Sequence, residues 1–504
     1  MSTLLALAPM SMEAGALRRG APGALVARTG AGPSRAAAGL DGHLATARRH
    51  GVAAVAVAGV AGGLVAGMVP GQVVVADRVL RPDGSVVAEL ASAALLAGAL
   101  RRDGLRASVG GVVSTTRLVR SDAERRALAE SSGALAVDLE SATLVEADWG
   151  RPAAVVRVVA DVPGHRLVSP RTALDLARGL SALCRSGPGM QRWAEAAGRR
   201  SVILAGPRSY CAGVERAIET VRRAVERFGT PLYVRRQIVH NAHVVAELES
   251  AGAVFVRELD QVPEGATVVL SAHGVSPAVR AEAASRQLRV VDATCPLVAK
   301  VHTEMRRHAA RGDQLVLIGH PGHDETEGTL GEAPGIALVE APSDVARLDL
   351  DPERPVAYAT QTTLSPEETS ETVAALAARF PLLRGPSVSD ICYATHNRQE
   401  ALAAIAPRCD LVLVVGSATS SNSRRLVEVA ERLGVPGHLV DDEAGIDLDW
   451  LAGASTVGVT AGASAPESDV TRVLRAIESL GPLELTTAEV RRESVTFPLP
   501  QEVR

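Results

Sequence analysis

Three cysteines occupy equivalent places in an internal repeat, and this repeat constrains the fold more than any other feature. Each cysteine follows a short apolar segment and opens a segment with helical periodicity; they are Cys211, Cys295 and Cys392. A polar loop then follows at a nearly constant distance. His240 lies 29 positions after the first cysteine, His323 lies 28 after the second, and Ser421 lies 29 after the third. Such self-similarity indicates one structural unit used three times.

Each repeat continues with a second apolar strand that ends in another polar loop. These loops carry His273, Thr362 and Ser464. In α/β folds, ligands bind beyond the carboxyl ends of the strands. Three such units around a pseudo-threefold axis would bring the three cysteines to one point, ringed by hydrogen-bonding groups. We therefore expect residues 201–504 to form a three-lobed α/β domain.

The cysteine positions predict a metal site. A cysteine at the start of a helix lies at the positive end of the helix dipole, which favours the thiolate, the form that binds soft metals. Three protein ligands leave one position open, as catalytic metals require. No Cys-x-x-Cys pair suggests structural zinc, so widely separated single cysteines favour an iron–sulfur cluster. Cys184 and Cys409 open no helix of the repeat and are expected to be ordinary buried cysteines.

The polar loops predict an anion site. His240, His273 and His323 can carry positive charge near neutral pH. Neutral donors at or near helix N-termini add to them: Thr362, Thr363, Ser420, Ser421, Asn422 and Ser464. The loops contain no lysine and no P-loop, which indicates a phosphate or diphosphate held by neutral donors and imidazoles. We expect Glu325, two residues after His323, to act as a proton donor.

Length and charge narrow the class of protein further. A chain of 504 residues exceeds one domain, and its net charge of −4 gives no basic field for nucleic acid. The apolar run 52–69 is interrupted by glycines, so a buried strand and helix are expected instead of a membrane span. No secretory leader pattern opens the sequence, and we expect a cytoplasmic protein.

Residues 1–184 predict a separate α/β domain. Its expected strands are Leu4–Ala8, Ala24–Ala27, Ala53–Ala58, Gln72–Ala76, Ser108–Ser114 and Ala153–Val159. Glycine turns after two of these strands, at 30–32 and 59–63, present backbone amides that could meet an anion. Residues 185–200 contain Ser-Gly-Pro-Gly and predict a linker, and 491–504 predict a short tail.

Six motifs carry a resemblance to a known family. They are Gly206-Pro-Arg-Ser-Tyr-Cys-Ala-Gly-Val, Ser271-Ala-His-Gly-Val-Ser, Asp292-Ala-Thr-Cys-Pro-Leu-Val, Gly322-His-Asp-Glu-Thr-Glu-Gly-Thr, Thr360-Gln-Thr-Thr-Leu-Ser and Thr460-Ala-Gly-Ala-Ser-Ala-Pro. They closely resemble the 4-hydroxy-3-methylbut-2-enyl diphosphate reductases, the IspH/LytB family, from about residue 201 to the end. The resemblance implies a [4Fe–4S] cluster on Cys211, Cys295 and Cys392. It also implies the final step of the non-mevalonate isoprenoid pathway.

The same resemblance implies roles for the loop residues. The diphosphate of the allylic substrate would be held by His240, His273, Ser420, Asn422 and Ser464, with Ser421 and His323 beside it. Glu325 and Thr362 would serve the hydroxyl group and proton delivery. The electrons would come from outside the chain, because residues 201–504 contain no flavin or nicotinamide fingerprint. The resemblance implies ferredoxin or flavodoxin as the electron donor.

Two other functions stay open for the cysteine repeat. An iron–sulfur hydro-lyase would share the open iron and the carboxylic acid but needs no external electrons. An iron–sulfur sensor would need no converging polar loops. An assay with the diphosphate substrate, run with and without a reductant, distinguishes the three.

The N-terminal part resembles a second family. Met12-Glu13, Gly59-Val-Ala-Gly-Gly-Leu64, Ala136-Val-Asp-Leu-Glu140 and Arg157-Val-Val-Ala-Asp161 are similar in order to motifs of the nucleoside phosphorylase and nucleosidase superfamily. The resemblance implies that Glu13 activates water and that Glu140 and Asp161 bind ribose and protonate the purine. A degenerate domain without catalysis is the alternative. With two such resemblances, the whole chain would be a fusion protein.

Overall fold

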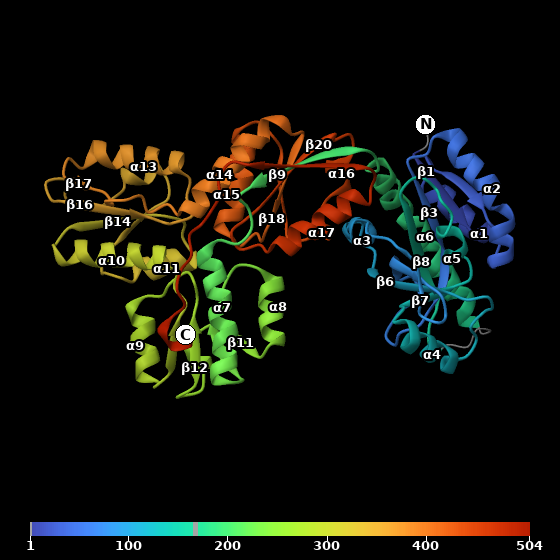
Figure 1. Cartoon of the computed structure of the whole chain (residues 1–504), viewed down its shortest axis with the longest axis horizontal. Helices are drawn as coiled ribbons and strands as arrows, with labels where there is room; N and C mark the ends of the chain where they lie inside the picture. Colours follow the sequence, from blue (N-terminus) through green and yellow to red (C-terminus); the bar gives the residue numbers. More distant parts are fainter. Residues whose placement is uncertain (1–2, 165–169) are drawn as a thin grey trace. The chain divides into compact units, whose positions relative to one another are not determined.

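The computed structural model describes residues 3–164 and 170–504. The chain forms two compact units (Figure 1). The first contains residues 1–202 together with 442–456 and 471–485. The second contains residues 203–441, 457–470 and 486–504.

The first unit is built on one mixed sheet. Its strands are β1 (Leu4–Ala8), β2 (Leu25–Arg28), β3 (Ala54–Gly63), β4 (Val73–Leu80), β5 (Val86–Glu89), β6 (Ala107–Ser114), β7 (Ala136–Asp138) and β8 (Ala153–Asp161). The order is β2-β1-β3-β7-β6-β4-β5, and β8 pairs with both β3 and β4, which closes a ring of strands. All six predicted strands are present. The apolar run 52–69 contains the largely buried strand β3, but the helix expected in this run is wrong, because turns follow β3 and the next element is β4. No helix of the described residues is long and apolar enough to cross a membrane.

Helices surround this sheet. They are α1 (Ser11–Gly20), α2 (Pro33–His50), α3 (Ala93–Arg102), α4 (Asp122–Ser132), α5 (Ser141–Val145) and α6 (Pro170–Glu195). Strands β1, β3, β4 and β8 are rich in Val, Ala and Leu and mostly buried, the pattern of strands covered on both faces, whereas the edge strands β2 and β5 are more exposed. The expected α/β class of the N-terminal part is therefore confirmed.

The predicted linker is mostly a helix. Helix α6 continues to Glu195, and its glycines mark a close crossing with α1 instead of a flexible connection. A Cβ on Gly187 would lie 2.4 Å from the carbonyl carbon of Gly20, and one on Gly189 would lie 2.7 Å from a methyl group of Leu100. The small residues of Ser-Gly-Pro-Gly are therefore present because the helices pack closely. Composition alone does not distinguish this cause from a flexible linker, because both favour small residues.

The compact units also differ from the predicted boundary at 184–201. Residues 442–456 and 471–485, from the last third of the chain, belong to the first unit. They include η3 (Glu443–Gly445) and α16 (Leu448–Leu451). Arg102 donates to the carbonyl oxygens of Ala444 and Ile446 at 3.1 and 2.8 Å. A Cβ on Gly98 would lie 2.1 Å from the Ala444 oxygen, so this packing has no room for a larger residue.

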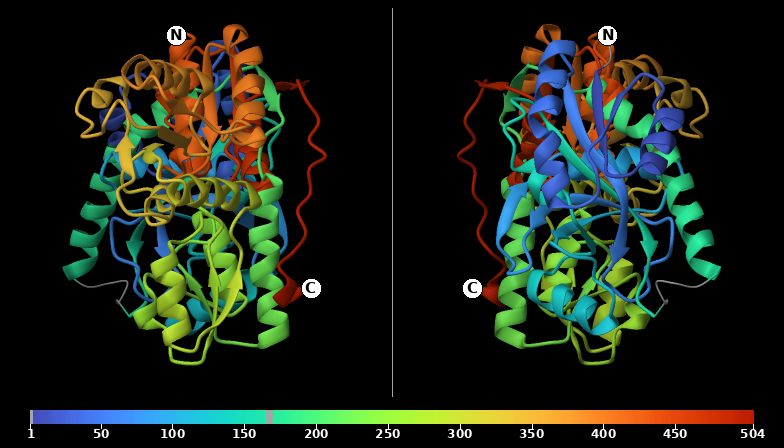
Figure 2. Two further views of the ribbon diagram at one scale, coloured as in Figure 1. Left: turned by 90° about the vertical axis from the view of Figure 1, so that its left-hand side faces the viewer. Right: turned by 90° about the vertical axis from the view of Figure 1, so that its right-hand side faces the viewer.

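The second unit consists of three lobes, each with its own sheet (Figures 1 and 2). The first lobe contains β10 (Leu232–Arg235), β11 (Ala253–Val256), β12 (Thr267–Leu270) and β13 (Arg289–Asp292) in the order β11-β10-β12-β13. The second contains β14 (Gln314–Ile318), β15 (Ala337–Val339), β16 (Val356–Thr360) and β17 (Leu383–Arg384) in the order β15-β14-β16-β17. The third contains β9 (Arg200–Gly206), β18 (Leu411–Val415), β19 (Gly437–Val440), β20 (Thr456–Ala461) and β21 (Leu483–Glu489) in the order β19-β18-β20-β9-β21.

Helices complete each lobe around its own apolar core. They are α7 (Ala212–Phe228), α8 (Ala242–Ser250), α9 (Pro277–Ser285), α10 (Pro296–Ala310), α11 (Asp324–Leu330), α12 (Pro342–Val345), α13 (Pro366–Arg379), α14 (Tyr393–Ile405) and α15 (Ser421–Arg432). Helix α17 (Glu467–Glu478) begins in the second unit, and its residues from 471 onward belong to the first. In each lobe the two strands that precede the polar loops are adjacent and parallel: β10 with β12, β14 with β16, and β18 with β20. The threefold repeat predicted from the sequence is therefore confirmed.

We predict that Gly187→Ala lowers the stability of the first unit by about 1–3 kcal/mol, because the added methyl group meets the backbone of Gly20. All three tryptophans, Trp149, Trp193 and Trp450, belong to this unit, so tryptophan fluorescence during urea unfolding measures the effect. Gly198→Ala is the matched control, since its Cβ would meet no atom within 4 Å. Equal unfolding midpoints for the two variants would contradict the crossing described above.

Candidate active site

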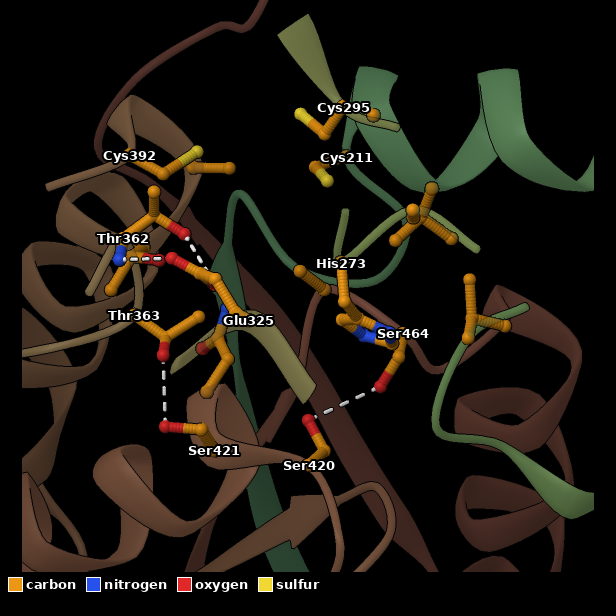
Figure 3. Close-up of a pocket in the computed structure, with 18 of the residues that line it drawn as sticks. Cys211, His273, Cys295, Glu325, Thr362, Thr363, Cys392, Ser420, Ser421 and Ser464 are labelled. Carbon is orange, nitrogen blue, oxygen red and sulfur yellow. Dashed lines mark hydrogen bonds between the residues drawn. The ribbon is translucent and has the colours of Figure 1, made fainter. Parts of the chain in front are cut away.

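The three repeat cysteines meet in one pocket of the second unit (Figure 3). Each is the residue that caps a helix N-terminus: Cys211 on α7, Cys295 on α10 and Cys392 on α14. A Cβ on Gly213 would lie 2.8 Å from the sulfur of Cys295 and 3.8 Å from that of Cys211. Gly213 therefore leaves open the space beside two sulfur atoms, as a bulky sulfur-bound group requires.

The electrostatic state of these thiols differs from the sequence expectation. Burial raises the pKa of Cys295 to about 11 and that of Cys392 to about 12. Backbone amides at the helix N-termini act in the predicted direction, since those of Leu297 and Val298 lower the pKa of Cys295, but burial outweighs them. The helix dipole alone therefore does not produce thiolates here. A cationic metal group bound to all three sulfur atoms would do so, and the residues present fit such a group.

The other two cysteines lie outside this pocket. Cys409 donates its thiol to the Ile405 carbonyl at 3.3 Å, and a Cβ on Gly458 would lie 2.9 Å from its sulfur. Cys184 belongs to α6, where its carbonyl faces Gly20. Neither lies with the repeat cysteines, but both are half-buried instead of fully buried as expected.

Glu325 lies in the same pocket, in the first turn of α11, with 4% of its surface exposed. Its carboxylate accepts the backbone N–H of Thr362 at 2.7 Å and the Thr362 hydroxyl at 3.0 Å. Burial raises the pKa of Glu325 to about 7, although the two bonds from Thr362 oppose the rise. An acid with this pKa carries a proton in a large fraction of molecules near neutrality, as a general acid must.

Three histidines form a cluster in the same pocket, and one of them, His323, accepts the backbone N–H of Glu325 at 3.2 Å. The rings of His240 and His273 stack with centroids 4.3 Å apart, and His323 meets them edge-on at 5.5 and 5.7 Å. Burial lowers the pKa of all three, that of His323 to about 4. The three histidines are therefore neutral in the protein without a ligand, and the expectation that they are positively charged is wrong for this state. The buried Nε2 of His240 and Nδ1 of His273 have no hydrogen-bond partner among the described residues, so both nitrogens remain for a ligand.

Hydroxyl groups of the third lobe lie at the N-terminus of α15. Ser420 caps this helix and accepts the backbone N–H of Ser423. The Ser464 hydroxyl donates to that of Ser420 at 3.3 Å, and the Thr363 hydroxyl donates to that of Ser421 at 2.9 Å (Figure 3). Asn422, one residue into the helix, also lines the pocket. This arrangement is a natural anion site.

Every residue predicted for the site of the second unit therefore lines this one pocket. Sequence reasoning missed Gly213 and Thr395, which also line it. Thr395 lies three residues after Cys392, one helical turn away, and that spacing was the available signal. Sequence reasoning also missed Arg424, whose positive charge lowers the pKa of His240 and His323.

The first unit contains a pocket of its own, which brings together the three carboxylates predicted there. Glu13 accepts the backbone N–H groups of Met10 and Val60, both at 2.7 Å. Glu140 accepts the N–H of Gly32 at 2.6 Å, so a carboxylate of the chain already occupies one of the glycine turns expected to bind an anion. Burial raises the pKa of both carboxyl groups.

Two features of this pocket were not expected. Asp161 forms an ion pair with the buried Arg125, so its carboxylate already has a partner within the chain. Arg157, fully buried, pairs with Asp138 and lies 3.7 Å from Glu140. None of the described residues that line the pocket is aromatic.

Comparison with known proteins agrees with this geometry. The model of the LytB protein family matches residues 202–478, more than half of the chain. The chain belongs to the LytB protein family. The family relative "4-hydroxy-3-methylbut-2-enyl diphosphate reductase 1" of Mycobacterium tuberculosis (strain CDC 1551 / Oshkosh) is 55% identical over 323 residues, 63% of this chain and 98% of the relative. The reductase of Aromatoleum aromaticum is 55% identical over 306 residues, 60% of this chain and 98% of the relative.

A solved structure extends the match of the LytB-family part to three dimensions. The structure of the E-1-hydroxy-2-methyl-but-2-enyl-4-diphosphate reductase from Plasmodium falciparum superposes with a TM-score of 0.58 at 36% identity. It covers 61% of this chain and 97% of its own. The model of the phosphorylase superfamily matches residues 11–175, which confirms the second resemblance.

Proposed function

We propose that the pocket of the second unit is the active site of a 4-hydroxy-3-methylbut-2-enyl diphosphate reductase. The reaction removes the allylic hydroxyl group with two electrons and two protons, and yields isopentenyl or dimethylallyl diphosphate and water. The observation that carries this proposal is the meeting of three thiols, one raised-pKa carboxyl group and an anion site in one pocket. Membership of the LytB family supports it.

Cys211, Cys295 and Cys392 would hold a [4Fe–4S] cluster by three of its irons, with one iron free of protein ligands. When bound, this group supplies the electrons and an open Lewis-acidic iron for the substrate hydroxyl group. The two electrons reach the site from an external carrier, for which ferredoxin or flavodoxin is proposed. Of the alternatives, a hydro-lyase would turn over without a reductant, and a sensor would not turn over at all.

The diphosphate would lie against the imidazoles of His240 and His273 and the polar groups of Ser420, Asn422 and Ser464. His323 and Ser421 lie beside this set. The three histidines are neutral before binding, and a bound anion favours their protonated forms. We therefore expect binding to draw protons onto the imidazoles, which would offset the charge of the diphosphate. This anchoring fixes the carbon chain before electrons arrive.

Glu325 would give the leaving hydroxyl group its proton. The bonds from the Thr362 amide and hydroxyl hold the carboxyl group in place, and burial keeps a proton on it near neutrality. Because the pKa is raised, the donating form is present below about pH 7 and is lost as the pH rises through that value.

The assignment of three cysteines as cluster ligands predicts that replacing one of them has a different effect from replacing a cysteine outside the pocket. Cys295→Ser should abolish or greatly destabilise the brown chromophore and end turnover, since two ligands do not retain the cluster. Cys409→Ser, a change to a cysteine outside the pocket, should do neither. Iron content and visible absorbance after anaerobic reconstitution measure both variants. Full iron content in the Cys295→Ser protein would exclude the assignment.

The proton donor makes a second prediction. Glu325→Gln retains the shape and can still bond Thr362, but it has no acidic proton, so turnover should fall by about 10²–10⁴-fold while substrate still binds. The wild-type rate should decline above about pH 7, and this decline should be absent from the residual rate of the variant. Steady-state rates with a chemical reductant across pH test both points. Wild-type turnover in Glu325→Gln would remove Glu325 from this role.

A second candidate function belongs to the first unit. We infer a nucleoside-cleaving activity there, because Glu13 and Glu140 lie with Asp161 in one pocket and the phosphorylase superfamily model matches this part. Glu13 would activate the attacking water and Glu140 would bind the ribose. Asp161 can protonate a leaving purine only if its ion pair with Arg125 opens. Without such opening the domain would be degenerate.

This candidate predicts release of free purine from adenosine-type nucleosides by the full chain. Glu13→Gln should stop the release because the base is lost, while the iron content of the second unit stays unchanged. Chromatography of the products, with and without phosphate, also separates hydrolysis from phosphorolysis. A panel of nucleosides that yields no purine would establish the degenerate alternative.

A further inference from the structure

Arg398 is a fully buried residue of α14, about two turns after Cys392. Its guanidinium group makes bonds in three directions. One direction is its own helix, where Nη1 donates to the Ala394 carbonyl at 2.9 Å. Burying a guanidinium group costs free energy unless its N–H donors are hydrogen-bonded, and Arg398 finds acceptors in the other two directions as well.

The second direction is the loop that delivers Cys211. Nε and Nη2 donate to the Ser209 carbonyl at 3.0 and 2.6 Å, and Nη2 also donates to the Tyr210 carbonyl at 3.1 Å. These are the two peptide groups directly before Cys211. Arg398 thus ties the segment that carries one cysteine to the helix that begins at another.

The loop needs such support. Ser209 has a φ of 61°, in the left-handed region that residues other than glycine adopt at a cost. Its hydroxyl donates to Glu467 at 2.7 Å, and its carbonyl oxygen accepts both bonds from Arg398. Without these bonds the loop could relax toward a commoner conformation, and Cys211 would move with it.

The third direction is the C-terminal tail, in which Glu493 provides the counter-charge. Its carboxylate accepts Nη1 at 3.0 Å and Nη2 at 3.4 Å, and also the side-chain N–H of Asn397 at 3.0 Å. Beyond it the tail runs along the outside of the second unit to its end beside α7 (Figure 2). Arg216 of α7 donates to the Pro498 carbonyl at 2.8 Å, and Val503 is buried in the core of the first lobe. The tail is therefore anchored at Glu493 and again beyond it, at residues 498 and 503.

We propose that Arg398, neutralised by Glu493, is a positioning residue that fixes Cys211 against Cys392, so that the C-terminal tail is part of the support of the cluster site. The inference rests on the proposed cluster but concerns residues that touch neither cluster nor substrate. Groups that orient metal ligands commonly change metal affinity by about 10–100-fold when they are lost. A buried arginine without its carboxylate also leaves an unpaired charge beside the loop.

Two variants of the full chain test the proposal. Glu493→Gln retains the shape of the side chain but removes the counter-charge. Arg398→Lys retains the charge but cannot reach the carbonyls of residues 209, 210 and 394 together, because an ammonium group lacks the planar fork. The matched control is Arg491→Ala, which removes an exposed ion pair between the same tail and Glu400 of the same helix.

Two measurements are made on each protein. The first is the rate at which a chelator extracts iron from the anaerobically reconstituted protein, which should rise about 10-fold or more in Glu493→Gln and Arg398→Lys and stay unchanged in Arg491→Ala. The second is amide hydrogen exchange of the iron-free protein, which should speed up at residues 208–211 beyond any change elsewhere in the second unit.

Wild-type extraction rates and wild-type exchange at 208–211 in both variants would overturn the proposal. Exchange that rises equally throughout the second unit would also overturn it, since that result means general stability instead of positioning. If the unaltered protein takes up no iron, the proposed cluster fails, and exchange at 208–211 still decides whether Arg398 holds this loop.

Discussion

The second unit depends on one constraint, the placing of three cysteine sulfur atoms in a single pocket by three separate lobes. Each sulfur lies at a helix N-terminus, and each of these helices packs on the core of a lobe. The lobes are held by apolar packing that does not involve the sulfur atoms, so the site is carried by a rigid scaffold. The positions of the cysteines relative to one another then depend on residues that connect different lobes, and Arg398 is such a residue.

Burial decides the charge state of nearly every group in this pocket. The same loss of water raises the pKa of Glu325 and of two cysteines and lowers that of the three histidines. The empty pocket is therefore close to neutral, although it is lined by groups that can ionise. Charge appears when a ligand or metal group brings an opposite charge, which couples binding to proton movement.

The first unit shows how little space its glycines leave. Gly20, Gly98, Gly187 and Gly189 all lie where a Cβ would meet neighbouring atoms at 2.7 Å or less. Its carboxylates are likewise bound to the chain itself, Glu140 to the Gly32 amide and Asp161 to Arg125. A ligand of this pocket has to compete with these internal partners, and this competition distinguishes it from the pocket of the second unit, where two imidazole nitrogens remain open.

The sequence by itself determined the threefold repeat, the six N-terminal strands, the three cysteines and the loop residues of the site. Strand and helix periodicity are local properties, and the repeat multiplied the signal of each motif. Only the tertiary structure decided the charge of the histidines and thiols, because burial depends on all three lobes at once. It alone showed that residues 185–195 are helical and that 442–456 join the first unit, since close packing and flexibility select the same small residues. Arg398 belongs to this second group, because its partners at 209 and 493 lie far from it in sequence and meet it only in the folded chain.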